Sequence, residues 1–150
     1  MEGAAIGILD GRRVMAVSTV RPDGWPQTTI VGYANIGFLL YFVISRSSQK
    51  FANIARDDRI SIAVGEEPPA IGLLQAVYAS AHAQEVGDPE EREQAWSLLT
   101  SRHPNLKEYT LPDQSDPVVM RARCEHVSVL DFTKGFGHAR AFDATISAGT

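Results

Sequence analysis

Residues 43–64 read VISRSSQKFANIARDDRISIAV, in which a polar and basic loop separates two apolar segments. The loop follows an apolar run that is typical of a buried strand. Ser47 or Ser48 can cap a helix over about residues 49–56, because apolar side chains recur on one face there. From residue 59 to 64 apolar and small residues alternate with the period of a half-buried strand. The stretch therefore predicts a strand, a loop, a short helix and a second strand.

The loop itself, Ser45-Arg46-Ser47-Ser48-Gln49-Lys50, concentrates groups that bind anions. Two cations, several hydroxyls and the free N–H groups of a helix N-terminus together can hold a phosphate. Serines that merely cap a helix and cations that decorate a surface give the same pattern. The loop alone leaves both interpretations open.

The rest of the chain adds further β-prone segments and few helices. The clearest helix start is Asp88-Pro89-Glu90-Glu91, with a capping Asp, a Pro in the first helical position and a Glu three residues after the cap. We expect that helix to run to Arg102 or His103, where Pro104 prevents simple continuation. The other expected elements are a helix over Glu2–Asp10 and strands over Val14–Val20, Gln27–Tyr33, Phe38–Ile44, Arg59–Val64, Ile71–Val86 and Val118–Phe132.

About six strands interrupted by two or three helices favour a mainly β fold with flanking helices. The strands follow one another too closely for βαβ alternation, so the pattern predicts a β-barrel whose open ends are covered by helices. With 150 residues the chain is the size of a single domain, and we expect one domain over residues 1–150.

Composition narrows the function classes. The net charge of −4 argues against a general nucleic-acid-binding or anionic-membrane-binding surface. The apolar runs are too short for a membrane helix, and the N-terminus lacks the pattern of a secretory signal. Cys124 is the only cysteine, which excludes an intrachain disulfide and favours a reducing compartment. We expect a cytoplasmic protein without a metal site, since the four histidines show no metal-ligand spacing.

Two blocks of the sequence resemble a known family. Residues 14–27, VMAVSTVRPDGWPQ, are similar to the first hairpin of the pyridoxamine-phosphate-oxidase superfamily, and residues 43–64 are similar to its strand, basic phosphate loop, helix and following strand. The resemblance implies a six-stranded split β-barrel that forms a homodimer. It also implies an FMN at the interface between the two subunits.

The resemblance further implies the positions of the cofactor-binding residues. The second and third strands would flank the flavin, the loop would hold its phosphate, and Gln75 would lie against its ring. The implied residues are Thr28, Thr29, Ile30, Val31, Val43, Ile44, Ser45, Arg46, Ser48, Gln49, Lys50 and Gln75. Pyridoxamine phosphate oxidases proper have arginines at the positions that Thr28 and Gln49 occupy. Their absence argues against vitamin B6 oxidation itself, and Arg46 would compensate for part of the lost charge.

Residues 130–140, LDFTKGFGHAR, resemble the ending of small FMN-binding relatives. Glycines around Phe136 allow a ligand to approach the backbone closely, and His138 or Arg140 would face the substrate. A flexible terminal turn with an exposed histidine explains the same residues.

These observations lead to a functional hypothesis of an FMN-dependent oxidoreductase. It would transfer hydride or electrons between the flavin and a small organic substrate, with NADH or NADPH as a possible electron donor. Two alternatives stay open. One is a deazaflavin-dependent reductase on the same fold, and the other is a non-enzymatic protein that binds flavin or haem.

Overall fold

The structure is a computed structural model that describes residues 2–108 and 116–144. Its strands are β1 (Val14–Val20), β2 (Pro26–Ile36), β3 (Leu39–Ser45), β4 (Arg59–Gly65), β5 (Gln75–Glu85), β6 (Pro117–Asp131) and β7 (Ala139–Asp143). Its helices are α1 (Glu2–Gly11), α2 (Gln49–Arg56) and α3 (Pro89–Arg102). Three short 3-10 turns complete the described elements: η1 (Ile71–Leu73), η2 (Pro104–Glu108) and η3 (Phe132–Lys134).

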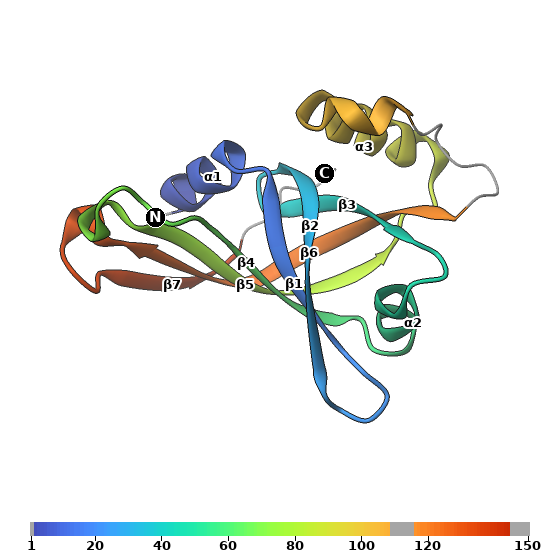
Figure 1. Cartoon of the computed structure of the whole chain (residues 1–150), viewed down its shortest axis with the longest axis horizontal. Helices are drawn as coiled ribbons and strands as arrows, with labels where there is room; N and C mark the ends of the chain where they lie inside the picture. Colours follow the sequence, from blue (N-terminus) through green and yellow to red (C-terminus); the bar gives the residue numbers. More distant parts are fainter. Residues whose placement is uncertain (1, 109–115, 145–150) are drawn as a thin grey trace.

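The strands form an antiparallel sheet that closes into a barrel. Its order is β3-β2-β1-β4-β5-β6-β7, and β3 also pairs with β6, which closes a ring of six strands (Figure 1). The predicted six-stranded barrel is therefore confirmed. Among the described residues the seventh strand, β7, pairs with β6 alone and lies outside the ring, and no alternation of apolar and polar residues predicts it.

The barrel interior holds most of the apolar core. Tyr33 and Phe42, neighbours across β2 and β3, are both fully buried there. A smaller apolar cluster lies on the outside, where α3 packs against β2, β3 and β6. Burial raises the pKa of the Cys124 thiol to about 12, so this cysteine is a packed core residue and not a nucleophile.

One part of the barrel wall is open. Over its first seven residues, from Pro26 to Gly32, β2 pairs with β1 but not with β3. Its partners on β3 begin at Tyr33 opposite Phe42 and end at Ile36 opposite Leu39. Beyond Phe42, β3 continues along β6 as far as Ser45. The two strands therefore separate, and the barrel is split on this side.

Helix α2 lies next to the split and matches its predicted bounds. Ser48 caps it, since the Ser48 hydroxyl accepts a hydrogen bond from Phe51 N at 3.1 Å. Asn53 anchors it to the wall: its amide nitrogen donates to Thr19 Oγ1 and to Gln27 Oε1, both at 3.0 Å. Asn53 is 0% exposed, so these bonds replace water that its amide has lost.

Helix α3 also follows its prediction. The Asp88 side chain accepts a hydrogen bond from Glu91 N at 3.0 Å, and Pro89 stands in the first turn. The prediction of one long strand from Ile71 to Val86 is wrong at its start, because η1 occupies Ile71–Leu73 and β5 begins at Gln75. No described helix is long and apolar enough to cross a membrane.

We expect the Asn53→Ala variant to lose about 1–3 kcal/mol of unfolding free energy, because Thr19 and Gln27 would keep buried polar atoms without a partner. Urea unfolding followed by circular dichroism measures this loss. Gln94→Ala on the exposed face of α3 is the control and should change stability by less than about 0.5 kcal/mol. Equal stability of the two variants would contradict the anchoring role of Asn53.

Candidate functional site

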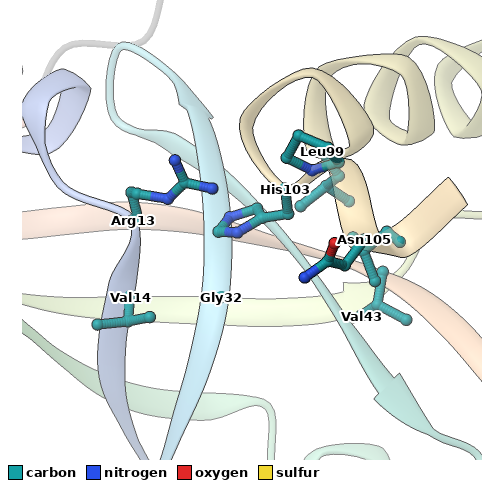
Figure 2. A pocket seen from close by; sticks show the side chains of 9 residues that line it. Arg13, Val14, Gly32, Val43, Leu99, His103 and Asn105 are labelled. Atoms are coloured by element: carbon teal, nitrogen blue, oxygen red, sulfur yellow. The ribbon is translucent and has the colours of Figure 1, made fainter.

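A cavity begins where β2 and β3 separate. Continuation of the pairing would place Gly32 opposite Val43, and both residues instead line a cavity of about 380 Å³ between the strands and the end of α3 (Figure 2). Its apolar walls are Val14, Val43, Leu99, Pro104 and Leu106, and its polar groups belong to Arg13, His103 and Asn105. The opening in the barrel wall is therefore also the mouth of an apolar pocket.

His103 covers one side of this cavity. It ends α3, where its backbone N–H bonds to Leu99 O. Its Nε2 lies 2.8 Å from Tyr33 O, and since a carbonyl only accepts, Nε2 carries the hydrogen and Nδ1 is the free acceptor. The imidazole lies over Gly32, where an added Cβ would come within 3.0 Å of the ring. The sequence did not predict that His103 belongs to a site, because no local pattern in α3 indicates a contact with β2.

A second, smaller cavity of about 200 Å³ lies along the free end of β3. It shares Val43 and Leu106 with the first cavity and extends to Ser45 and Asp116. The two cavities together follow β3 from the point of separation to the polar loop. The polar side chains that line the second cavity are those of Ser45 and Asp116, so it reaches the edge of the loop without including Arg46 or Lys50.

The loop after β3 has its own internal partners. Asp116 accepts hydrogen bonds from the hydroxyls of Ser45 and Ser47. Arg46 makes a two-pronged contact with Glu85, at 3.2 Å and 2.9 Å. These contacts lower the pKa of both carboxyl groups: the hydroxyl of Ser45 is the largest cause for Asp116, and the guanidinium of Arg46 is the largest cause for Glu85.

The remaining residues of the loop differ in their hydrogen bonds and ion pairs. Ser48 serves as the helix cap, and its hydroxyl also donates to Ser45 O at 2.6 Å. The Gln49 amide donates to Asn53 Oδ1 at 2.8 Å. Lys50 makes no ion pair with any described residue. Of the two predicted cations, Lys50 is thus the uncommitted one.

The predicted residues 28–31 of β2 alternate between the outer face and the interior of the barrel. Thr28 and Ile30 point outward; the Thr28 hydroxyl bonds to that of Ser18 at 2.6 Å, and Ile30 is 68% exposed. Thr29 and Val31 point toward the interior, where Val31 packs against the core. Thr29 Oγ1 is buried and has no hydrogen-bond partner among the described residues. None of the predicted residues 28–31 is among the residues that line the two cavities along β3.

The remaining predicted residues lie at the other end of the molecule. Gln75 donates to Asp131 Oδ1 at 3.4 Å, where β5 begins and β6 ends. His138 and Arg140 lie before and within β7, which is on the left of Figure 1, whereas α2 is on the right. A single chain therefore does not bring Gln75, His138 and Arg140 to the polar loop.

The outer face of the sheet carries an unusual row of residues. The strand register aligns Ile30, Ala16, Ala63 and Tyr78 across β2, β1, β4 and β5. Small side chains in the middle of the row leave a shallow apolar hollow of about 470 Å³, and Tyr78 beside it is 46% exposed. An apolar surface of this kind is typical of a protein–protein contact.

Comparisons with solved structures agree with the fold. A haem-binding protein from Mycobacterium smegmatis matches with a TM-score of 0.78 and 21% identity, over 93% of this chain and 57% of that one. HutZ, a haem storage protein from Vibrio cholerae, matches with a TM-score of 0.70 and 17% identity, over 83% and 89%. A putative pyridoxamine 5'-phosphate oxidase from Listeria innocua matches with a TM-score of 0.70 and 18% identity, over 86% and 97%.

The chain thus spans less than two thirds of the Mycobacterium smegmatis protein, and no curated protein matches it. At these identities the solved structures establish the fold alone. The family described as pyridoxamine 5'-phosphate oxidase matches residues 1–131, which include the complete ring of strands, the split and the polar loop. This chain therefore belongs to the pyridoxamine 5'-phosphate oxidase family.

Proposed function

We propose that this chain binds FMN in the split between β2 and β3 and acts as an oxidoreductase on a small organic substrate. The observation that carries the proposal is the pair of neighbouring cavities along the free end of β3, which share Val43 and Leu106 and reach the polar loop at Ser45. An isoalloxazine ring is flat and largely apolar, whereas the ribityl phosphate is charged. Val43, Leu99 and Leu106 offer apolar contacts to the ring, and the loop beyond Ser45 carries Lys50 for the phosphate.

At the polar end, Lys50 and the first turn of α2 are suited to a phosphate. Lys50 has no ion pair among the described residues, so its ammonium group is available without breaking a contact. The N–H groups at the start of an α-helix attract anions.

At the apolar end, Val43, Leu99 and Leu106 would exclude water from one side of the ring. His103 is held by Tyr33 in one orientation and keeps Nδ1 free to accept a proton or a hydrogen bond. When bound, the flavin supplies the hydride or electron chemistry. The tasks of these residues are to orient the ring and the substrate.

We also propose that two chains associate through the outer face that contains Ile30 and Tyr78. The apolar row on this face supports self-association. A second copy could supply His138 and Arg140, which one chain holds far from its own loop. NADH or NADPH is the proposed electron donor.

Haem is the second candidate ligand. Two of the structural relatives are named for haem binding or storage, and the cavity at Gly32 combines apolar walls with a histidine. A deazaflavin is a further alternative, because it would use the same apolar pocket and polar loop.

Titration with FMN, followed by absorbance and flavin fluorescence, tests the proposal. We expect wild-type protein to bind FMN, and Lys50→Ala to weaken FMN at least about tenfold while riboflavin changes little, because only FMN carries the phosphate. Lys107→Ala, an exposed lysine of η2, is the charge-matched control. Equal weakening of both ligands would contradict the role of Lys50. A shift of the haemin Soret band without any flavin binding would favour haem instead.

The association of two chains makes a separate prediction. Tyr78→Asp places a charge on the apolar face without removing a core contact, so we expect a fall from dimer to monomer mass in light scattering, together with weaker FMN binding. Ser97→Asp, on the exposed face of α3, should leave the mass unchanged. A wild-type protein that is monomeric with FMN bound would contradict the shared site.

A further inference from the structure

We propose that Asp116 is a specificity-determining residue that competes with the cofactor phosphate for the polar loop. The proposal rests on the proposed function, because it assumes that a phosphate-bearing cofactor approaches this loop. Asp116 lies 71 residues after Ser45 in the sequence. Its charge would set the preference between phosphorylated and unphosphorylated ligands.

The Asp116 carboxylate already makes the contacts that a phosphate would make. Its Oδ1 accepts hydrogen bonds from Ser47 N at 3.2 Å and from Ser47 Oγ at 3.0 Å, and its Oδ2 accepts one from Ser45 Oγ. The backbone fixes it there, since Arg46 N donates to Asp116 O at 2.6 Å. One carboxylate therefore occupies the hydroxyl half of the loop.

A second carboxylate engages the arginine of the loop. Glu85 holds both terminal nitrogens of Arg46, and the guanidinium lies over the Phe51 ring at 5.3 Å from its centroid. Arg46 and Lys50 carry two positive charges, Glu85 and Asp116 carry two negative charges, and Arg92 is a further cation near Glu85. An FMN phosphate, with a charge of about −1.5 to −2, thus meets two carboxylates as well as the cations of the loop.

The physical consequence is a discrimination against phosphate. To reach the hydroxyls of Ser45 and Ser47, the phosphate must displace the Asp116 carboxylate or lie beside it, and like charges at such distances repel. Asparagine at position 116 keeps the shape and can still accept from Ser47 N and Ser47 Oγ through Oδ1, but it lacks the charge, and its Nδ2 can only donate to Ser45 Oγ. The Asp116→Asn variant therefore removes the negative charge while keeping the contacts to Ser47.

The experiment compares dissociation constants for FMN and riboflavin in wild type, Asp116→Asn and Asp23→Asn. Asp23 lies in the exposed turn between β1 and β2, where it pairs with Arg21, and corrects for the change in net charge. We expect Asp116→Asn to tighten FMN by about fivefold or more and to change riboflavin less than twofold. Asp23→Asn should change neither ligand.

A second readout does not require flavin. Inorganic phosphate should raise the Tm of Asp116→Asn more than that of wild type. In wild type the Asp116 carboxylate competes with phosphate for the hydroxyls of Ser45 and Ser47, and in the variant this charge is absent. Unchanged or weaker FMN binding by Asp116→Asn, or equal tightening of both flavins, overturns the proposal. Asp116 would then only stabilise the conformation of the loop. Failure of every variant to bind any flavin overturns the proposed function instead, and the phosphate response then decides the role of Asp116 by itself.

Discussion

The architecture depends on a change of partner by β3. As far as Phe42 this strand pairs with β2 on one side and β6 on the other, and from Val43 to Ser45 it keeps only β6. The closed half of the wall lets Tyr33 and Phe42 complete the core, while in the open half β2 and β3 no longer pair with each other. Burying such edges requires another element or a ligand. The cavity at Gly32 and the polar loop at the end of β3 both follow from this separation.

Two elements far apart in the chain border the open half. His103, at the end of α3, covers Gly32 from outside, and α2 is fixed from the other side through Asn53. Because Gly32 has no side chain, the imidazole can approach the strand closely. The site is thus built from the rigid ends of a helix and a strand, which is how a pocket keeps its shape before a ligand arrives.

Local signals explain which features the sequence predicted. Ser48 and Asp88 are caps, and their hydrogen bonds reach residues only three positions away. The alternation around Ile62 likewise reports a strand with one buried face. The family resemblance of residues 14–27 and 43–64 then supplied the barrel, because those two blocks form β1, the start of β2, the polar loop, α2 and β4.

The features that the sequence did not predict depend on distant pairs. Asp116 and Ser45 are 71 residues apart, and His103 and Tyr33 are 70 apart. No sequence periodicity connects such residues. The contact of Asp116 with the loop and the position of His103 beside the cavity therefore follow only from the folded structure. β7 was missed for a different reason: Ala139 to Asp143 contains no β-branched residue, and the strand exists because the edge of β6 accepts it.

Backbone hydrogen exchange tests the central claim, that the split between β2 and β3 is the cofactor site. Without FMN, the amides of residues 27–32 that face β3 have no strand partner among the described residues, so they should exchange faster than those of residues 33–36. Saturating FMN should slow exchange selectively in residues 27–32 and in the first turn of α2, as measured by residue-resolved NMR. Unchanged exchange in both segments, with FMN demonstrably bound, would place the cofactor elsewhere and contradict the account.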